Sequence, residues 1–265
     1  MTEHLRIDRD GGVLRIHLDK PAKRNALDDD MIAAMIDAVD AAGRDEAVRV
    51  ILFTGEGDHF CSGFDFVGRN RDAAQTRPRI GSIQRRLPSQ AHRLIPLLTT
   101  VQVPVVCAVR GWAAGVGLQV VAASDFAVVA DDATLWAPFT ERGFTPDGGG
   151  TWLLPRLIGT ARAREMLLLG RAVSGTEAAA WGLVHQAIPA SEVDSAVDAI
   201  VQQLANGPTV ALGLMKWMLA AGASASLEEQ LRNEAFALEL SSRSEDFREG
   251  LAAFKEKRPP RFEGR

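Results

Sequence analysis

The length, composition and charge of this chain describe a globular protein and exclude several functional classes. Its 265 residues are 46% hydrophobic and 24% charged, which gives ample material for a core and excludes a disordered chain. The formal net charge of -4 provides no basic field for a phosphate backbone, and the one dense basic cluster is KEKRPPR near the C-terminus. We therefore expect no nucleic-acid partner.

Cysteine usage and hydropathy favour a cytoplasmic protein. Cys61 and Cys107 form neither a disulfide framework nor a metal-ligand pattern, so no metal site is expected. The first ten residues lack the basic-then-apolar order of a signal peptide. The apolar runs 103–109 and 113–123 are too short or too interrupted for a membrane span of about twenty residues. We expect no membrane partner.

Strand-like segments and a helix alternate in the first half of the chain. Between residues 13 and 55, acidic residues at 28–30 and apolar residues at i, i+4 spacing up to Gly43 predict an amphipathic helix. Segments rich in Val, Ile and Leu predict strands over 13–18, 48–55, 103–111 and 125–130. This alternation predicts an α/β fold rather than a helical bundle or a sandwich.

The sequence becomes helical after about residue 156, where strand signals nearly disappear. Ser174 and Glu177 form the pattern of a capping box. No Gly/Ser-rich or Pro-rich linker separates the two halves, so we expect one domain or a closely packed pair, with a core over 1–195 and a helical region over 196–265. Helices are predicted over 164–170, 174–184, 191–205, 208–221, 226–241 and 244–256.

Three glycine-bearing segments are each explained as tight turns when taken alone. GWAAGVGLQVVAASD (111–125) follows a predicted strand and leaves backbone N–H groups without partners, yet it matches neither G-x-G-x-x-G nor a P-loop. HFCSGFDF (59–66) follows the strand at 48–55 in the same manner. GFTPDGGGTW (143–152) carries Asp147, which local chemistry explains as a turn residue or a helix N-cap.

Taken together, these motifs resemble the crotonase, or enoyl-CoA hydratase/isomerase, superfamily. The resemblance implies an α/β fold in which a spiral of ββα turns is followed by a C-terminal helical trimerisation region, with a homotrimer or a hexamer as the assembly. It implies an acyl-CoA thioester as substrate, so coenzyme A arrives as part of the substrate and no permanently bound cofactor is expected. Six ordered motifs carry it over essentially the whole chain: PAKRNALDDDM, GDHFCSGFDF, VRGWAAGVGLQVVAASD, GFTPDGGGTWLLPRLIG, SGTEAAAWGLVHQAIP and SEDFREGLAAFKEKRPPRFEGR.

The resemblance assigns the thioester carbonyl to two backbone amides. These belong to Phe64, which follows Ser62 and Gly63, and to Val116, which follows Gly115. An enolate-like oxyanion gains most from fixed donors, and a helix N-terminus adds a favourable dipole.

The same resemblance places coenzyme A along residues 62–67. The adenine is expected near the backbone of Ser62 to Phe66, which includes Asp65, and Lys23 and Arg24 are expected at the phosphates. Phe254 and Lys257 match positions that reach a neighbour's coenzyme A across a trimer. Ordinary surface charge is the alternative explanation for the two lysines.

Two positions depart from the hydratase pattern of this family. Hydratases carry glutamates where this chain has Gln119 and Phe139, and neither an amide nor a phenyl ring can act as a general base. Family members that isomerise unsaturated acyl-CoAs use an aspartate at the position of Asp147. The run PDGGGTWLLPR looks most like the ring-expanding isomerase of phenylacetyl-CoA breakdown. We therefore predict double-bond isomerisation with Asp147 as the proton shuttle.

The residues predicted around Asp147 fit this role. Trp136, Phe139 and Phe144 are expected to raise its pKa by desolvation, and together with Gln119 they are predicted to contact the substrate. Glu141 is a second candidate base, although we favour a solvated charge there.

Three alternative functions stay open. Aryl-CoA dehalogenases of this family use the matching aspartate as a nucleophile, together with a histidine that His92 could supply and a tryptophan where this chain has Phe139. A hydratase with atypical acid/base residues is the second alternative. A catalytically weak acyl-CoA-binding oligomer is the third.

Overall fold

A mixed sheet forms the centre of the molecule. The computed structural model describes residues 3–66 and 79–265. Within them, the larger sheet has the order β1-β2-β3-β4-β6-β9, and its β1–β2 pair is antiparallel while the other pairs are parallel. Every residue of β4 is buried, as a parallel strand covered on both faces requires. The strands are β1 (Leu5–Asp10), β2 (Val13–Leu18), β3 (Val50–Gly55), β4 (Val105–Val109), β6 (Phe126–Ala130) and β9 (Gln186–Ile188).

A second, smaller sheet continues from the first. Its strands are β5 (Trp112–Ala114), β7 (Thr134–Trp136) and β8 (Val173–Ser174). β5 follows β4 and leads into helix α5, while β7 follows β6 and leads towards helix α6. This repeated strand–strand–helix unit is the ββα turn expected from the sequence motifs.

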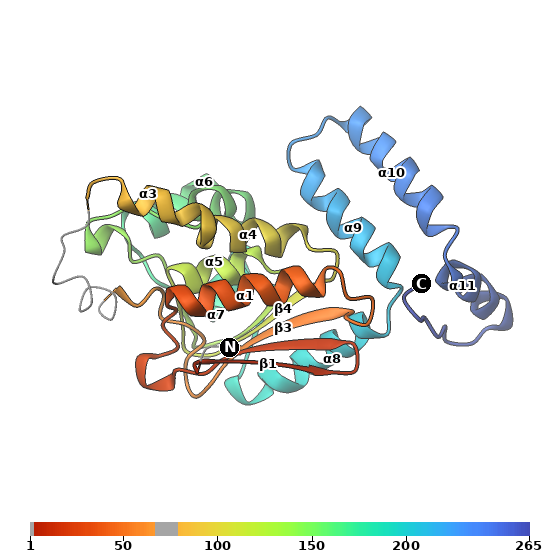
Figure 1. Ribbon diagram of the computed structural model, residues 1–265, viewed down its shortest axis with the longest axis horizontal. Coiled ribbons are helices and arrows are strands. Elements are labelled where there is room, and N and C mark those ends of the chain that lie inside the picture. Colours follow the sequence, from red (N-terminus) through yellow and green to blue (C-terminus); the bar gives the residue numbers. More distant parts are fainter. Residues whose placement is uncertain (1–2, 67–78) are drawn as a thin grey trace.

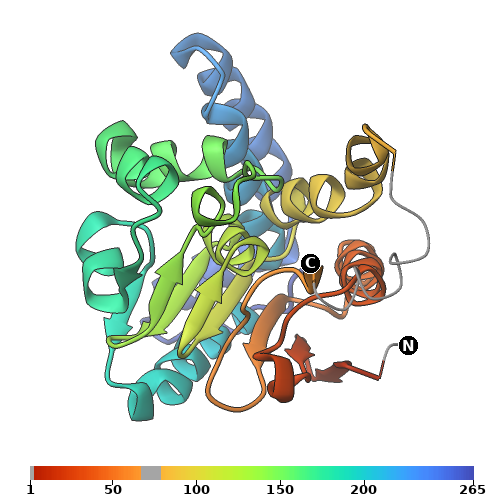
Figure 2. The same cartoon turned by 90° about the vertical axis from the view of Figure 1, so that its left-hand side faces the viewer.

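Helices cover both faces of the larger sheet. α8 packs against β3, β4 and β6, whereas α1, α4 and α5 pack on one another on the opposite side (Figures 1 and 2). The central strands are therefore covered on both faces, and the main cavity described below opens where helices and loops meet. The helices of this core are α1 (Asp29–Ala42), α3 (Ser82–Arg86), α4 (Ala91–Thr100), α5 (Val116–Ala123), α6 (Gly150–Leu168), α7 (Gly175–Trp181) and α8 (Val193–Ala205).

Local sequence signals fix several helix ends. The Asp28 carboxylate accepts a hydrogen bond from the Met31 N–H and caps α1. Ser174 and Glu177 form the predicted capping box at the start of α7. The apolar residues whose spacing predicted α1 lie on its buried face, so these predictions are confirmed.

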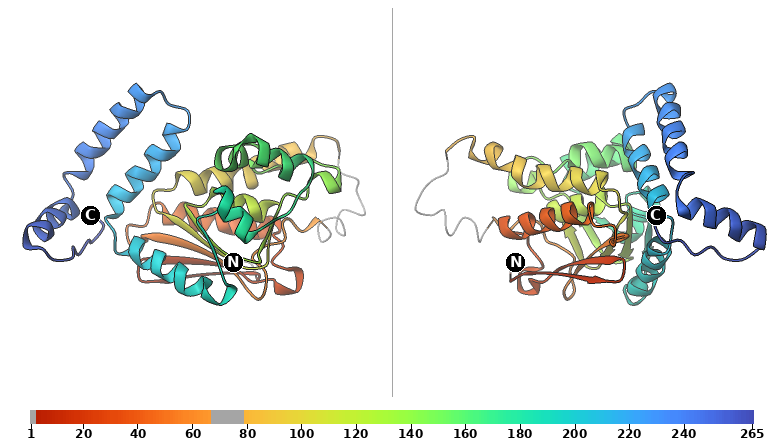
Figure 3. Two further views of the ribbon diagram at one scale, coloured as in Figure 1. Left: turned by 180° about the vertical axis from the view of Figure 1, so that it is seen from behind. Right: turned by 45° about the vertical axis from the view of Figure 1, so that its right-hand side comes forward.

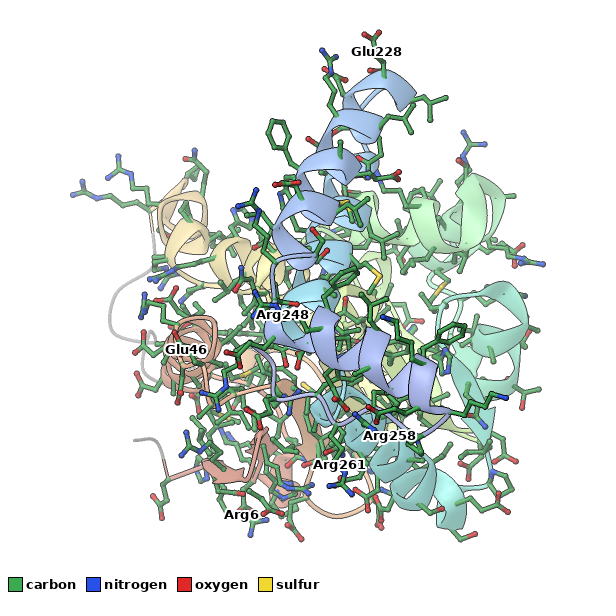
Figure 4. All side chains as sticks on the ribbon, turned by 90° about the vertical axis from the view of Figure 1, so that its right-hand side faces the viewer. Arg6, Glu46, Glu228, Arg248, Arg258 and Arg261 are labelled. Atoms are coloured by element: carbon green, nitrogen blue, oxygen red, sulfur yellow. The ribbon has the colours of Figure 1, made fainter. Side chains whose placement is uncertain are left out.

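Three C-terminal helices form an arm that extends from the core (Figures 1 and 3). They are α9 (Thr209–Gly222), α10 (Leu227–Ser241) and α11 (Glu245–Glu256). Figure 4 views this arm from its own side, with Glu228 at the tip of α10 and Arg258 beside α11. Lys216 of α9 is buried and its Nζ lies 2.6 Å from an Asp125 carboxylate oxygen, which ties the arm to the core.

The structure adds elements that the sequence did not predict. β1 has one buried and five exposed residues, so its hydropathy pattern is that of a surface segment. The expectation of an almost strand-free second half misses β8 and β9, which have two and three residues. The boundary expected between residues 195 and 196 falls within α8, which packs on the core sheet.

No helix of the described residues is long and apolar enough to cross a membrane.

Candidate active site

Two glycine-bearing segments run side by side at one end of the small sheet. Cys61 and Ala113 form a parallel bridge, and the Ala114 N–H donates to the Cys61 carbonyl oxygen at 2.9 Å. Gly63 and Gly115 have positive φ angles of 103° and 54°. A Cβ atom on Gly63 would lie 3.2 Å from the Ala114 carbonyl oxygen, so glycine allows the close approach of the two segments.

The backbone amides of Phe64 and Val116, which follow these two glycines, are oriented by the bridge to Leu27 and by the start of α5. The Leu27 N–H donates to the Gly63 carbonyl oxygen and the Asp65 N–H donates to the Leu27 carbonyl oxygen, each at 2.8 Å. In such a parallel bridge the N–H of Phe64 points away from Leu27. Val116 is the first residue of α5, where a backbone N–H has no acceptor within the helix.

A large cavity opens at these two residues. Its volume is about 1130 Å³. The lining combines residues from the loop after β2, the segment before residue 67, α4, α5 and the loop before α6, so distant parts of the sequence meet here. Val67, the last residue expected along coenzyme A, lies outside the described residues. The predicted site residues that line the cavity are Lys23, Arg24, Ser62, Phe64, Asp65, Phe66, Val116, Phe144 and Asp147.

Asp147 lines this cavity from the loop before α6. Burial raises the pKa of its carboxyl group, and the nearby His92 opposes part of that shift. Among the residues that the structure describes, no lysine or arginine forms an ion pair with Asp147. The N-cap of α6 is Gly149, and no side chain caps this helix. The N-cap explanation of Asp147 is therefore wrong.

Gln119 lies behind the Asp147 turn instead of lining the cavity. Its side chain is 2% exposed, and neither its Oε1 nor its Nε2 atom has a hydrogen-bond partner among the described residues. A Cβ atom on Gly148 would collide with Oε1, and one on Gly150 would lie 3.3 Å from Nε2. The amide group is thus packed directly against the glycines that follow Asp147.

The predicted aromatic residues divide between the cavity wall and its surroundings. Phe144 lines the cavity, and its ring lies 5.2 Å from that of Phe66 and 5.6 Å from that of Phe139 between centroids. Phe139 is 4% exposed and supports Phe144 from behind. Trp136 points elsewhere, because its indole N–H donates to the Gly170 carbonyl oxygen at 2.8 Å. Neither Phe139 nor Trp136 is part of the cavity lining.

Lys23, one of the two basic residues expected at coenzyme A, forms an ion pair with the buried carboxylate of Asp65. The Lys23 Nζ atom lies 2.6 Å from an Asp65 oxygen, and the Lys20 Nζ atom lies 3.3 Å from the same oxygen. Arg24 lines the cavity beside them and has a positive φ of 51°. This pairing holds the loop after β2 to the segment that carries Phe64.

The remaining residues predicted at the site are His92 and Glu141, as possible catalytic residues, and Phe254 and Lys257, as coenzyme A contacts. His92 lines the cavity, whereas Glu141 is exposed and lies next to Gly170 outside it. Phe254 is 84% exposed on α11, in the arm, and Lys257 ends that helix with a positive φ of 53°. In one chain neither of these two residues reaches the cavity lining.

Sequence reasoning missed several polar residues of the lining. Arg86, Gln90 and Arg142 line the cavity, and the Nε atom of Arg86 is buried without a partner among the described residues. Gln90 lies just before α4, and Arg142 lies in a short 3-10 helix after β7. No motif distinguishes them from surface residues, so only the folded chain identifies them.

Comparison with known proteins identifies the family of this chain. The model of the enoyl-CoA hydratase/isomerase family matches residues 8–265. The chain belongs to the enoyl-CoA hydratase/isomerase family. Its mixed α/β fold is that of the crotonase superfamily, as the sequence motifs predicted. The crystal structure of an enoyl-CoA hydratase from Bacillus anthracis matches with a TM-score of 0.91 at 28% identity, covering 99% of this chain and 100% of the other.

Members of the family with different reactions resemble this chain. A 1,2-epoxyphenylacetyl-CoA isomerase of Escherichia coli (strain K12) is 35% identical over 266 residues, which are 100% of both chains. The 4-chlorobenzoyl coenzyme A dehalogenase-1 of Arthrobacter sp is 32% identical over 254 residues, covering 96% of this chain and 91% of the other. Family membership thus establishes an enzyme that acts on acyl-CoA thioesters, and the reaction has to be argued from the site.

Proposed function

We propose that this enzyme moves a double bond in an acyl-CoA thioester, with Asp147 as the proton shuttle. The observation that carries the proposal is the setting of Asp147. It is a carboxylate that lines the cavity, its pKa is raised by burial, and no lysine or arginine pairs with it among the described residues. Such a group can accept and release a proton without first breaking an ion pair.

The backbone supplies the other half of the mechanism. The thioester carbonyl binds to the amides of Phe64 and Val116, and the N-terminal end of α5 stabilises the negative charge of the enolate or dienolate. Asp147 removes an α- or γ-proton and returns it to the other carbon. The raised pKa favours this exchange, because the protonated form of Asp147 has to exist between the two transfers.

Hydration of an enoyl-CoA is disfavoured by the same site. It requires one group to activate water and one to deliver a proton. Gln119 cannot act as a base, Phe139 has no titratable group, and Asp65 is held by Lys20 and Lys23. We therefore expect slow turnover of crotonyl-CoA, and turnover within tenfold of a typical hydratase would favour the atypical-hydratase alternative.

A dehalogenase reaction is the second candidate, because His92 lies near Asp147 and lines the same cavity. In that reaction Asp147 attacks the aryl ring as a nucleophile. The Arthrobacter relative supports this alternative, while Phe139 in place of a tryptophan argues against it. Release of halide from 4-chlorobenzoyl-CoA tests it directly.

We further propose that coenzyme A lies along Ser62 to Phe66, with its phosphates near Lys23 and Arg24. The arm exposes large apolar side chains on each of its three helices, among them Leu219, Leu238 and Phe254, and these would be buried in a homotrimer or hexamer. In that assembly Phe254 and Lys257 would reach a neighbour's coenzyme A. Light scattering that shows a stable monomer at micromolar concentration would refute the assembly.

A panel of purified acyl-CoA thioesters tests the proposed reaction. Double-bond migration is followed by mass spectrometry and by deuterium exchange at the α- and γ-carbons, with thioester binding measured in parallel by calorimetry. Migration with exchange supports the isomerase. Binding without turnover of any thioester would favour the catalytically weak acyl-CoA-binding oligomer.

A further inference from the structure

Arg86 brings an unpaired guanidinium into the wall of the main cavity, which Asp147 also lines. It is the last residue of α3 and is half-buried. Its Nε atom is buried and has no hydrogen-bond partner among the described residues. No carboxylate of the described residues forms an ion pair with this side chain. A cationic group that loses water without gaining an acceptor costs free energy, so a ligand that supplies acceptors would be stabilised here.

Other half-buried arginines of the described chain have their acceptors within the protein. The Arg110 guanidinium lies 3.0 Å from an Asp194 carboxylate oxygen, and the Arg258 guanidinium lies 2.6 Å from a Glu249 carboxylate oxygen. Neither of these two arginines lines the main cavity. The missing acceptor at Arg86 therefore coincides with the place where a ligand can enter.

The residues that follow Arg86 lead along the cavity lining towards Asp147. Figure 1 shows α3 and α4 in succession along one edge of the core, and four of the residues at 87–92 line the cavity. Ala91 meets the Asp147 turn, because a Cβ atom on Gly148 would lie 3.5 Å from the Ala91 Cβ atom. Arg86 and the proposed proton shuttle therefore belong to one connected stretch of the lining.

The basic side chains of the lining outnumber the acidic ones. Four basic and two acidic side chains line the cavity, in a chain whose formal net charge is -4. The two residues that we propose at the phosphates of coenzyme A, Lys23 and Arg24, come from the loop after β2, and Lys23 is paired with Asp65 at 2.6 Å. Arg86 comes from α3 and has no such role. It is therefore matched to a further anionic group.

We propose that Arg86 binds a carboxylate at the far end of the acyl group, so that the substrate is a thioester between coenzyme A and a dicarboxylic acid. The inference rests on the proposed function, because it places the acyl group at Asp147. The guanidinium presents its N–H groups in a planar fork that matches a carboxylate, and such charged pairs are stronger than hydrogen bonds between neutral groups. A hydrocarbon end would leave the Arg86 Nε atom without an acceptor.

Matched pairs of saturated thioesters test the inference without requiring turnover. Glutaryl-CoA is compared with pentanoyl-CoA, and adipyl-CoA with hexanoyl-CoA, since the members of each pair have equally long acyl groups and differ in the terminal carboxylate. All four thioesters and free coenzyme A are titrated calorimetrically into the whole chain. We expect at least one carboxylated thioester to bind about tenfold more tightly than its uncharged partner, the usual contribution of a hydrogen bond to a charged group.

Three variants locate the effect. Arg86→Met removes the cation and should abolish the preference for the carboxylated thioester, while the affinities for free coenzyme A and for the uncharged thioesters stay unchanged. Arg86→Lys keeps the charge but not the planar fork and should retain part of the preference. Arg85→Met is the control, because Arg85 also lies in the last turn of α3 but is exposed and does not line the cavity. Its preference should match that of the wild type.

The outcomes separate this inference from the proposed function. Equal affinities within both pairs for the wild type would overturn the inference and leave acyl-CoA binding intact. The same loss of affinity for free coenzyme A and for all four thioesters in Arg86→Met would assign Arg86 to a phosphate of coenzyme A and would also overturn the inference. Failure of every thioester to bind the wild type would overturn the proposed function, and the inference with it.

Discussion

Asp65 and Asp147 line the same cavity, yet their surroundings differ. Asp65 is 9% exposed and its carboxylate is held by Lys20 and Lys23. Asp147 is partly buried, has a pKa raised by that burial, and forms no ion pair with lysine or arginine among the described residues. Burial beside a cation fixes the ionised form, whereas burial without one brings the two protonation states closer in free energy. The first setting is suited to structure and the second to proton transfer.

The largest effect should come from exchanging each carboxylate for an amide. Asp147→Asn should lower kcat for double-bond migration by about 10² to 10⁴, the usual contribution of one positioned acid/base group. Asp65→Asn should change kcat far less and act mainly on stability and on KM. Steady-state kinetics with one unsaturated acyl-CoA measures both variants. Equal losses of kcat would mean that the two aspartates do not have different roles.

The next effect concerns the lysines that hold Asp65. Lys20→Met should lower the free energy of unfolding by about 2 kcal/mol. The Lys20 side chain is only 11% exposed, and its loss removes one cationic partner from the carboxylate of Asp28 and one from that of Asp65. Urea unfolding measures the change. Lys23→Met is the control, since Lys23 is 45% exposed and an exposed ion pair contributes about 1 kcal/mol or less. A larger loss for the Lys23 variant would contradict this assignment.

A smaller effect should appear in the pH profile when a second carboxylate is placed near Asp147. The acid/base role requires ionised Asp147, so kcat should fall as pH drops through its pKa, which burial has raised above its usual value. Gln119→Glu puts a carboxyl against Gly148, and wherever this carboxyl is ionised it should move the acidic limb to higher pH. Gln119→Met should leave the limb in place. An unmoved limb in the Glu variant would show that the two positions are not coupled.

The sequence predicted the elements whose signals are local. Asp28 capping α1 and the Ser174–Glu177 box at α7 were readable because capping involves residues three apart. The six ordered motifs predicted the family and its fold for a related reason: each is a contiguous stretch. β1 was missed because its residues are nearly all exposed, and β9 because its three residues leave too little periodicity.

The arrangement of the site was less predictable, because it depends on contacts between distant segments. Gln119 was expected at the substrate, but its place behind Gly148 follows from the packing of α5 on the start of α6. Trp136 was expected beside Asp147, but its indole N–H turns to the Gly170 carbonyl oxygen. Arg86 has no sequence signal, because its place in the cavity lining arises only where separate helices and loops meet.

Proton exchange in deuterated water tests the role of Asp147 most directly. The wild type and Asp147→Asn are incubated with an acyl-CoA, exchange at its α- and γ-carbons is followed by mass spectrometry, and affinity is measured by calorimetric titration. Asp132→Asn, at an exposed turn, serves as the control. The account predicts that Asp147→Asn loses exchange while its affinity stays close to that of the wild type. Exchange at the wild-type rate in Asp147→Asn would show that this carboxylate is a turn residue and not the proton shuttle.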